Sequence, residues 1–272
     1  MAKSYILAAA FSALSLPALA GSLLVEPDPV LIAPEPAPES PSLVFTLFGG
    51  VSGQPTYFGS SELEARPSFG FSLDFARLPW GRSIGNADPD AENYGFTPRG
   101  SFRVISERDS DESPELAGLN KVDTAVEVGL GLGYAQRHFE AFADVRYGVT
   151  GHKSFVGELG ADAVFKLNDQ FTVKLGPRLL AGSGRYADTY FGVTAAEAAS
   201  SSFDAFDASG GLLTAGIELG ATYKLNKDWG IDGALRWDKF TGSAEDSPIV
   251  AQGRDSNVSL RLGLTRRVSL SF

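Results

Sequence analysis

Hydrophobic and polar residues alternate along most of the chain after Ser42, as they do in β-strands that have one apolar and one polar face. In segment 213–225, for example, Leu219 falls on the apolar face and Glu218 on the polar face. Amphipathic helices of comparable strength are not predicted between these segments. We expect ten strands, at 43–52, 67–78, 94–107, 122–135, 138–150, 154–167, 170–183, 211–225, 228–241 and 257–272.

The connections between the predicted strands fall into two classes that alternate along the chain. Tight turns lie at 136–137, 168–169 and 226–228, and long connections at 53–66, 108–121, 184–210 and 242–256. Outer-membrane barrels combine an even number of long strands with short periplasmic turns and longer extracellular loops. The sequence therefore predicts an all-β, antiparallel transmembrane β-barrel of about ten strands, with its tight turns in the periplasm.

One connection departs from this alternation. Segment 79–93 falls on the periplasmic side but is long. It could hide two further strands, so a barrel of twelve strands remains an alternative.

Aromatic residues on the apolar faces support the barrel independently, because they gather near the strand ends. Membrane barrels carry such aromatic belts at both membrane–water interfaces. Those beside the tight turns are Tyr134, Phe139, Phe165, Phe171, Tyr223 and Trp229, and those at the opposite ends are Tyr147, Phe155 and Trp237.

The N-terminal residues predict export from the cytoplasm. A basic residue, Lys3, precedes an apolar run at 5–16 and a small-x-small cleavage signature ending at Ala20, so residues 1–20 are expected to be a signal peptide. Residues 21–41 contain six prolines and four acidic residues, which predicts an extended, Pro-rich acidic periplasmic linker. The barrel is then expected to occupy residues 42–272.

Composition narrows the possible functions. The chain has 272 residues with 23 Lys+Arg, 33 Asp+Glu, two His and no Cys. The absence of Cys rules out a disulfide scaffold, a thiolate metal site and a thiol nucleophile, and two histidines argue against a multi-histidine metal centre. A net charge of −10 argues against nucleic acid as a partner. We expect no cofactor and no metal.

The polar faces of the strands predict a charged lumen. Taking one parity for each strand places ten acidic and ten basic residues inside the barrel. Balanced charge in a narrow lumen favours a paired network over a selective conduit, although a small polar pore remains an alternative. The residues predicted for this lumen charge network are Glu127, Arg146, Glu158, Asp162, Lys174, Arg178, Glu218, Arg236 and Arg261.

Catalytic signals in the sequence are weak. His152 lies in a short outward loop, and Asp188, Asp246 and Asp255 lie in loops on the same side. Ten-stranded outer-membrane proteases use a histidine and acidic residues at this rim, but such a set is also expected by chance on acidic loops. The GxSxG signature of many hydrolases does not occur. We therefore expect a protein that is not an enzyme, without catalytic residues.

Five short motifs carry a resemblance to a known family. They are QPTYFGS at 54–60, LAGL at 116–119, GP at 176–177, YFGVT at 190–194 and DSPIV at 246–250. Together, and in this order, they resemble the MltA-interacting protein / OmpV family of outer-membrane proteins. The principal motif residues are Pro55, Tyr57, Gly59, Ser60, Gly176, Pro177, Tyr190, Phe191, Gly192, Val193, Asp246, Ser247 and Pro248.

The resemblance implies a function as well as a fold. It implies a bacterial outer-membrane barrel, surrounded by outer-membrane lipid, that acts as a scaffold between a murein-cleaving lytic transglycosylase and a murein-synthesising penicillin-binding protein. Other members are discussed as adhesins, immunogens or antibiotic-response proteins. We therefore expect a non-enzymatic scaffold or interaction protein, with a small pore or transport protein for small polar solutes as the alternative.

Overall fold

The computed structural model describes residues 41–88 and 94–272. The expected signal peptide at 1–20 lies outside the described residues, as does the expected linker at 21–41 except for its last residue. The described residues belong to one compact unit, Glu39–Phe272.

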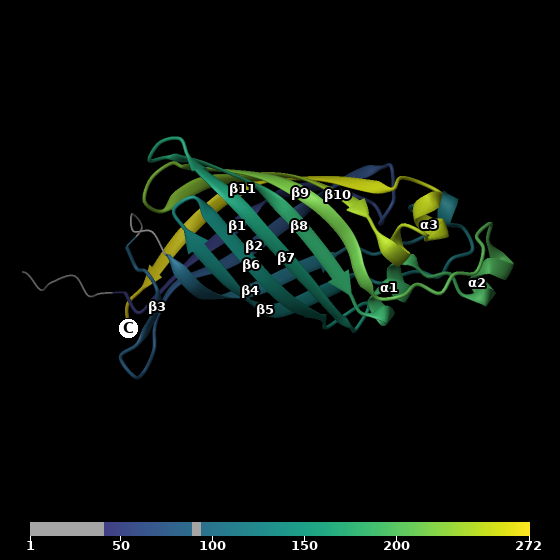
Figure 1. Ribbon diagram of the computed structural model, residues 1–272, viewed down its shortest axis with the longest axis horizontal. Coiled ribbons are helices and arrows are strands. Elements are labelled where there is room, and N and C mark those ends of the chain that lie inside the picture. The colour runs from purple at the N-terminus through teal and green to yellow at the C-terminus, as the bar shows by residue number, and fades with distance from the viewer. Residues whose placement is uncertain (1–40, 89–93) are drawn as a thin grey trace, which may run out of the picture. The chain divides into compact units, whose positions relative to one another are not determined.

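Eleven strands form one antiparallel sheet, in the spatial order β3-β2-β1-β11-β10-β9-β8-β7-β6-β5-β4 (Figure 1). The strands are β1 Leu43–Pro55, β2 Leu63–Arg77, β3 Ser83–Gly85, β4 Gly95–Ile105, β5 Ala125–Gln136, β6 Phe139–Gly148, β7 Phe155–Lys166, β8 Phe171–Gly182, β9 Gly211–Lys224, β10 Trp229–Phe240 and β11 Ser256–Leu270.

The first and last long strands close the sheet into a barrel. β1 pairs with β11, so that Thr46 faces Arg267 and Val51 faces Leu262. The two edges of the sheet, β3 and β4, lie beside each other, and β2 also lies against β4. The result is a nearly closed barrel, which confirms the predicted all-β, antiparallel barrel class.

Each of the ten predicted segments contains a strand, but two connections differ from expectation. Segment 79–93 contributes one short strand, β3, of three residues, so its described part holds one of the two further strands that the twelve-strand alternative required. The connection predicted at 53–66 is shorter, because β1 and β2 remain paired as far as Pro55 and Leu63. A strand pattern does not show where a hairpin stops pairing.

Apolar side chains on the outside of the barrel remain exposed. Leu130 is 77% exposed and Phe96 is 72% exposed, and many other large apolar residues on the strands are more than one-third exposed. Aromatic rings pair on this surface near the tight turns, with Phe96 and Tyr134 at 4.8 Å between ring centroids. A continuous apolar outer band with interfacial aromatic residues is the surface that a bilayer requires.

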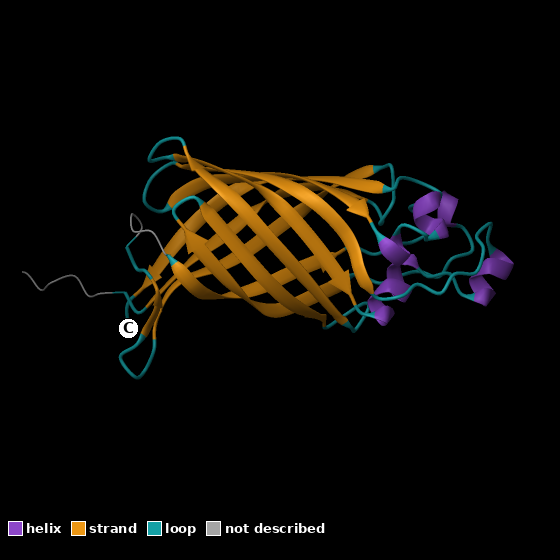
Figure 2. Cartoon of the chain, viewed as in Figure 1, coloured by secondary structure: helices purple, strands orange, loops and turns teal. Residues whose placement is uncertain are grey.

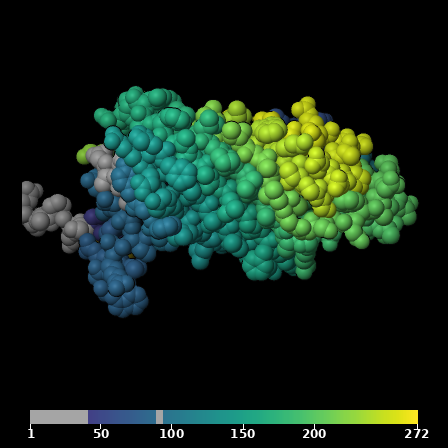
Figure 3. Space-filling view, viewed as in Figure 1, coloured from purple at the N-terminus to yellow at the C-terminus, as the bar shows by residue number. Residues whose placement is uncertain are grey.

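The helices gather at one end of the barrel (Figure 2). They are η1 Pro114–Leu116, α1 Gly184–Phe191, α2 Ala195–Ser200, η2 Gly242–Ala244 and α3 Pro248–Ala251. None of the described helices is long and apolar enough to span a membrane. The connections 56–62, 106–124, 183–210 and 241–255 together form what we call the cap, whose segments after residue 183 are green to yellow in Figure 3.

The hydrophobic core sits in and below the cap rather than along the barrel wall. Tyr186, Phe191, Leu213 and Phe240 are fully buried and belong to one cluster. Ile249 is fully buried in a second, adjoining set of residues that includes Leu116 and Phe203. Long connections that carry their own core form an ordered structure rather than loose loops.

Candidate functional site

Glu127 on β5 is the centre of the charged lumen. Its side chain is fully buried and accepts hydrogen bonds from Arg103 Nη2 at 2.7 Å and from Arg146 Nε at 2.9 Å. Arg103 lies on β4 and Arg146 on β6, the two neighbours of β5 in the sheet. One buried carboxylate is therefore held between two guanidinium groups, the arrangement that compensates a charge removed from water.

From Arg146 the ion pairs continue across the lumen. Arg146 Nη2 lies 2.9 Å from Glu158 on β7, and Glu158 also accepts a hydrogen bond of 2.5 Å from Arg236 on β10. Arg236 in turn donates to Asp238 at 2.7 Å. Because β8 and β9 separate β7 from β10 in the sheet, the pair of Arg236 with Glu158 spans the inside of the barrel.

A second set of ion pairs is centred on Arg178. Its Nη2 donates to both carboxylate oxygens of Asp162 at 3.0 Å and to Glu218 at 3.1 Å. Arg178 and Asp162 have side chains that are 6% and 7% exposed. Lys174 and Glu140 pair at 2.6 Å on the same side of the sheet, but both are 37% exposed. The lumen therefore contains both buried ion pairs and ion pairs that are partly exposed to solvent.

All nine residues predicted for the lumen charge network take part in ion pairs, including Arg261, which pairs with Asp232 at 2.9 Å. Further residues join these pairs without having been among the nine. They share the inward parity of their strands and belong to the ten acidic and ten basic residues that parity places inside the barrel: Arg99, Arg103, Glu140, Asp144, Asp232 and Asp238.

His152 is buried, although its position in a short outward loop suggested a residue at the rim of the barrel. It is 2% exposed, its Nδ1 lies 2.7 Å from Ser154 Oγ, and its Nε2 lies 3.2 Å from Glu127. Its ring packs edge-on against Tyr186 of α1 at 4.9 Å. His152 therefore joins the lumen network to the cap core, while Asp188, Asp246 and Asp255 are exposed on the cap.

Most of the motif residues meet in the cap although they are far apart in sequence. Ser247 donates a hydrogen bond of 2.7 Å to the Phe191 carbonyl, and Phe58 packs against the rings of both Tyr190 and Phe191. Gly59 has a φ of +95°, and a Cβ there would lie 2.9 Å from Val250 Cα. Only glycine combines this conformation with so close an approach.

The remaining cap motif residues are placed nearby. Tyr57 and Val193 are buried, Ser60 Oγ accepts from Thr56 at 2.7 Å, and Gly192 ends α1. Pro55 ends β1, Asp246 follows η2, and Pro248 begins α3.

Gly176 and Pro177 lie apart from the cap, within β8. The ladder between β7 and β8 is interrupted opposite them, passing from the Gly160–Arg178 pair to the Ala163–Leu175 pair. Since proline has no N–H to donate, such a gap is where a strand can accept it. These two residues therefore shape the barrel wall and do not contribute to the cap.

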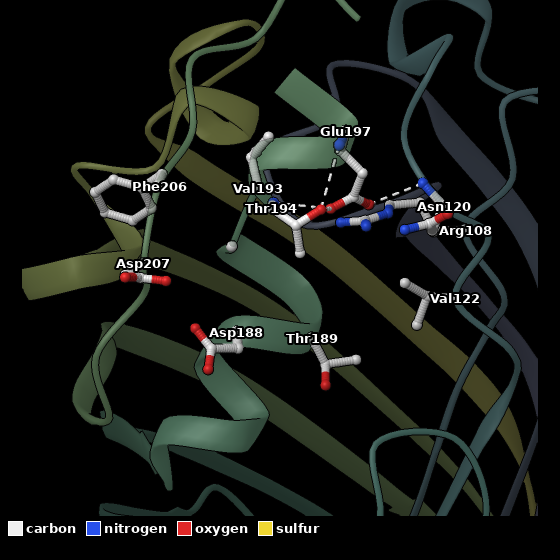
Figure 4. Close-up of a pocket in the computed structure, with 11 residues that line it drawn as sticks. Arg108, Asn120, Val122, Asp188, Thr189, Val193, Thr194, Glu197, Phe206 and Asp207 are labelled. Atoms are coloured by element: carbon white, nitrogen blue, oxygen red, sulfur yellow. Dashed lines mark hydrogen bonds between the residues drawn. The ribbon is translucent and has the colours of Figure 1, made fainter. Parts of the chain in front are cut away.

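The cap contains a pocket of about 340 Å³ between the 106–124 and 183–210 connections (Figure 4). Glu197, at the start of α2, accepts hydrogen bonds from the backbone N–H of Asn120 at 2.9 Å and from Thr194, in a capping box. Burial would raise the pKa of Glu197, but these hydrogen bonds outweigh it and hold that pKa below its usual range.

Arg108 lines the same pocket. It is 7% exposed, and burial lowers the pKa of its guanidinium although Glu197 acts in the opposite direction. Across residues 41–88 and 94–272, no three His, Asp or Glu side chains are grouped so that they could hold a metal ion.

An apolar outer band, a charged interior and antiparallel closure define the class of bacterial outer-membrane β-barrel proteins. Residues 47–268 match the family model described as MltA-interacting protein MipA. The chain belongs to this family, and its location is the bacterial outer membrane.

The solved structures that resemble the chain are outer-membrane proteins, at low identity. OprG from Pseudomonas aeruginosa is 12% identical, over 85% of this chain and 98% of that chain, with a TM-score of 0.26. The NanC porin is 10% identical, over 83% of this chain and 100% of that chain, with a TM-score of 0.34. Neisserial surface protein A is 9% identical, over 84% and 97%, with a TM-score of 0.26. No curated protein matches the chain.

Proposed function

We propose that this protein is a non-enzymatic scaffold of the outer membrane that holds a lytic transglycosylase and a penicillin-binding protein near the murein layer. The family description, MltA-interacting protein, supports a murein enzyme as partner. The structural observation that carries the proposal is the Arg236–Glu158 ion pair, which occupies the lumen between β7 and β10.

Cross-lumen ion pairs favour a scaffold over a pore for a physical reason. A conducting pore needs a continuous water-filled path, and a side-chain pair that reaches through the lumen between β7 and β10 occupies part of that path. The buried cluster around Glu127 and the cap core above it add two further barriers. We therefore expect planar bilayers that contain the refolded protein to stay electrically silent. Steady ohmic steps would support the pore alternative instead.

The scaffold needs a surface that faces the murein layer, and the tight-turn end is the proposed periplasmic surface. The chain has no native cysteine, so single cysteines report accessibility directly. Arg137→Cys would place a thiol in an exposed tight turn, and Ser202→Cys would place one on an exposed part of the cap. A membrane-impermeant maleimide added to intact cells should label only the cap variant. Labelling of the Arg137→Cys variant alone would show that the tight turns, and not the cap, face the outside of the cell.

The partners are tested by crosslinking in intact cells. An affinity tag inserted beside Ser202, which is exposed on the cap, leaves the proposed periplasmic surface unmodified. Mass spectrometry should recover a lytic transglycosylase and a penicillin-binding protein above the level found with an unrelated tagged outer-membrane barrel. Equal recovery from both barrels would refute the scaffold.

The Pro-rich segment 21–41 provides a matched variant for the same experiment. If this acidic segment is a docking strip, its deletion should lower recovery of one or both murein enzymes while the barrel still folds. Unchanged recovery would restrict docking to the barrel turns.

A further inference from the structure

Arg108 carries a donor without an acceptor. Its side chain is more than nine-tenths buried, and its Nη1 donates to the Tyr190 carbonyl at 3.1 Å. Its Nε is buried and has no hydrogen-bond partner within the described ranges. Buried charged donors in native proteins are nearly always paired, and Arg108 lines a cavity, so its guanidinium is the group of this cavity that can meet the anionic part of a ligand.

Glu197, the nearest candidate acceptor, is already engaged. Its Oε1 accepts from Asn120 N, and its Oε2 accepts from Thr194 N at 2.9 Å and Thr194 Oγ1 at 2.6 Å (Figure 4). The ion pairs found in residues 94–272 do not include one between Arg108 and Glu197. Glu197 therefore stabilises the Arg108 charge from a distance and leaves the Nε donor unsatisfied.

The rest of the pocket adds negative charge. Asp188 and Asp207 also line it, and both are exposed. With Glu197 the lining carries three carboxylates against the single guanidinium of Arg108, a formal charge of 1 − 3 = −2. A simple anion would be repelled by this balance, whereas a molecule that also carries a positive group would not.

From these observations we infer that the cap pocket binds a small zwitterion whose carboxylate meets Arg108 and whose ammonium group meets Asp188 and Asp207. The volume of about 340 Å³ lies near the lower end of ligand pockets, which span roughly 300–1,000 Å³. Val122, Val193 and Phe206 give the pocket an apolar wall. An α-amino acid with an apolar side chain fits this combination. The inference is independent of the scaffold function.

Three probes that share one aromatic ring separate the two charged contacts. L-Phenylalanine carries both charges, 3-phenylpropionate lacks the ammonium group, and phenethylamine lacks the carboxylate. Calorimetric titration of the full barrel refolded in detergent micelles should show binding of phenylalanine, corrected with empty micelles. Each of the other two probes should bind about tenfold more weakly or worse, because each loses one charge-assisted contact.

Variants assign the contacts to residues. Asp188→Asn with Asp207→Asn should weaken phenylalanine binding about tenfold or more and leave phenethylamine no stronger than 3-phenylpropionate. Asp204→Asn is the matched control, because Asp204 is exposed in the same connection but does not line the pocket. Arg108→Gln should remove the advantage of phenylalanine over phenethylamine. If that variant does not fold, the two probes on the unmodified chain decide the same question.

Several outcomes would overturn the inference. If phenethylamine binds as tightly as phenylalanine, Arg108 does not contact the ligand. If 3-phenylpropionate binds as tightly as phenylalanine, Asp188 and Asp207 do not contact it. The absence of phenylalanine binding at millimolar concentration would reject the site. Binding of phenylalanine by a chain that recovers no murein enzyme would refute the scaffold and leave this inference standing.

Discussion

Ser247 donates a hydrogen bond of 2.7 Å to the backbone carbonyl of Phe191, 56 residues away in the sequence. Ser247 is fully buried, and its Oγ also accepts from Ile249 N at the start of α3. One hydroxyl therefore begins a helix and fastens the 241–255 connection to α1. This relationship explains why the DSPIV and YFGVT motifs, distant in sequence, belong to one structural unit.

The first prediction follows from this contact. Ser247→Ala should leave the Phe191 carbonyl without its partner in a buried site, which costs about 1–3 kcal/mol. Because the strands do not depend on this bond, we expect the barrel to stay folded while protease cleaves the 183–210 connection faster. Ser202→Ala is the control, since Ser202 is exposed in that connection. Equal cleavage of both variants would contradict a fastening role for Ser247.

The lumen allows a matched comparison of a buried ion pair with a partly exposed one. Arg178→Ala would leave Asp162, which is 7% exposed, without the Nη2 group that donates to both of its carboxylate oxygens. Removing one member of a fully buried pair costs about 3–5 kcal/mol. Lys174→Ala breaks the Lys174–Glu140 pair, whose members are 37% exposed, and should cost about 1 kcal/mol or less.

Urea unfolding of the two variants in lipid measures this difference. Equal losses for Arg178→Ala and Lys174→Ala would mean that water screens both pairs alike. The lumen would then be wetter than the packing indicates, and the pore alternative would gain support.

The strands could be predicted from sequence because lipid and lumen impose opposite demands on alternate residues. Leu219 faces outward and Glu218 pairs inward with Arg178, as the alternation indicated. The pairing partners could not be predicted in the same way. Arg236 reaches Glu158 because the curvature of the sheet brings the inner faces of β10 and β7 within reach of each other, and the alternation along one strand contains no information on this curvature.

The burial of polar residues in short connections could not be predicted from the sequence either. The sequence of the 149–154 connection predicted that His152 lies at the rim of the barrel, whereas in the structure its ring points inward to Glu127. Loops lack the periodicity that reports which way a side chain points. Positions such as Arg108, whose role depends on α1 and α2 folding over it, carry no local signal at all.

The cap should loosen at alkaline pH. Burial raises the pKa of Tyr186 on α1 to about 12, with the Glu127 charge adding to the rise and Arg103 opposing it. An unfolded tyrosine titrates near pH 10. The neutral phenol therefore stabilises the cap fully below about pH 10, and this contribution is lost as the pH rises to about 12, by roughly 3 kcal/mol at most.

Proteolysis of the 183–210 connection as a function of pH tests this expectation. Tyr186→Phe keeps the ring and removes its titration, so part of the alkaline loss should disappear. Burial also raises the pKa values of Tyr57 and Tyr190, and these residues should account for the remainder. An unchanged pH profile in Tyr186→Phe would exclude Tyr186 as a source of the loss.

Substitutions on the two faces of the wall test the register of the barrel. Leu130 and Leu219 lie mid-strand on the outer face, where they are 77% and 44% exposed. Arginine at either position should destabilise the barrel by about 2–4 kcal/mol at the bilayer midplane, because a charge would enter the hydrocarbon. Unfolding in lipid vesicles measures the loss, and a neutral effect would place these leucines outside the bilayer core.

The glycines that follow these leucines, Gly131 and Gly220, lie on the inner face and supply the control. Substitutions at the two glycines should differ in their effect on stability. Sequence alternation suggests that small polar replacements are tolerated at both Gly131 and Gly220. The structure contradicts this for Gly131, where a Cβ would collide with the Asp144 carboxylate and lie 2.6 Å from the Ala143 carbonyl oxygen. At Gly220 the nearest atom, Cβ of Lys174, would be 3.8 Å away. Gly220→Ser should therefore be nearly neutral and Gly131→Ser destabilising, and the reverse order would show that the strand register is wrong.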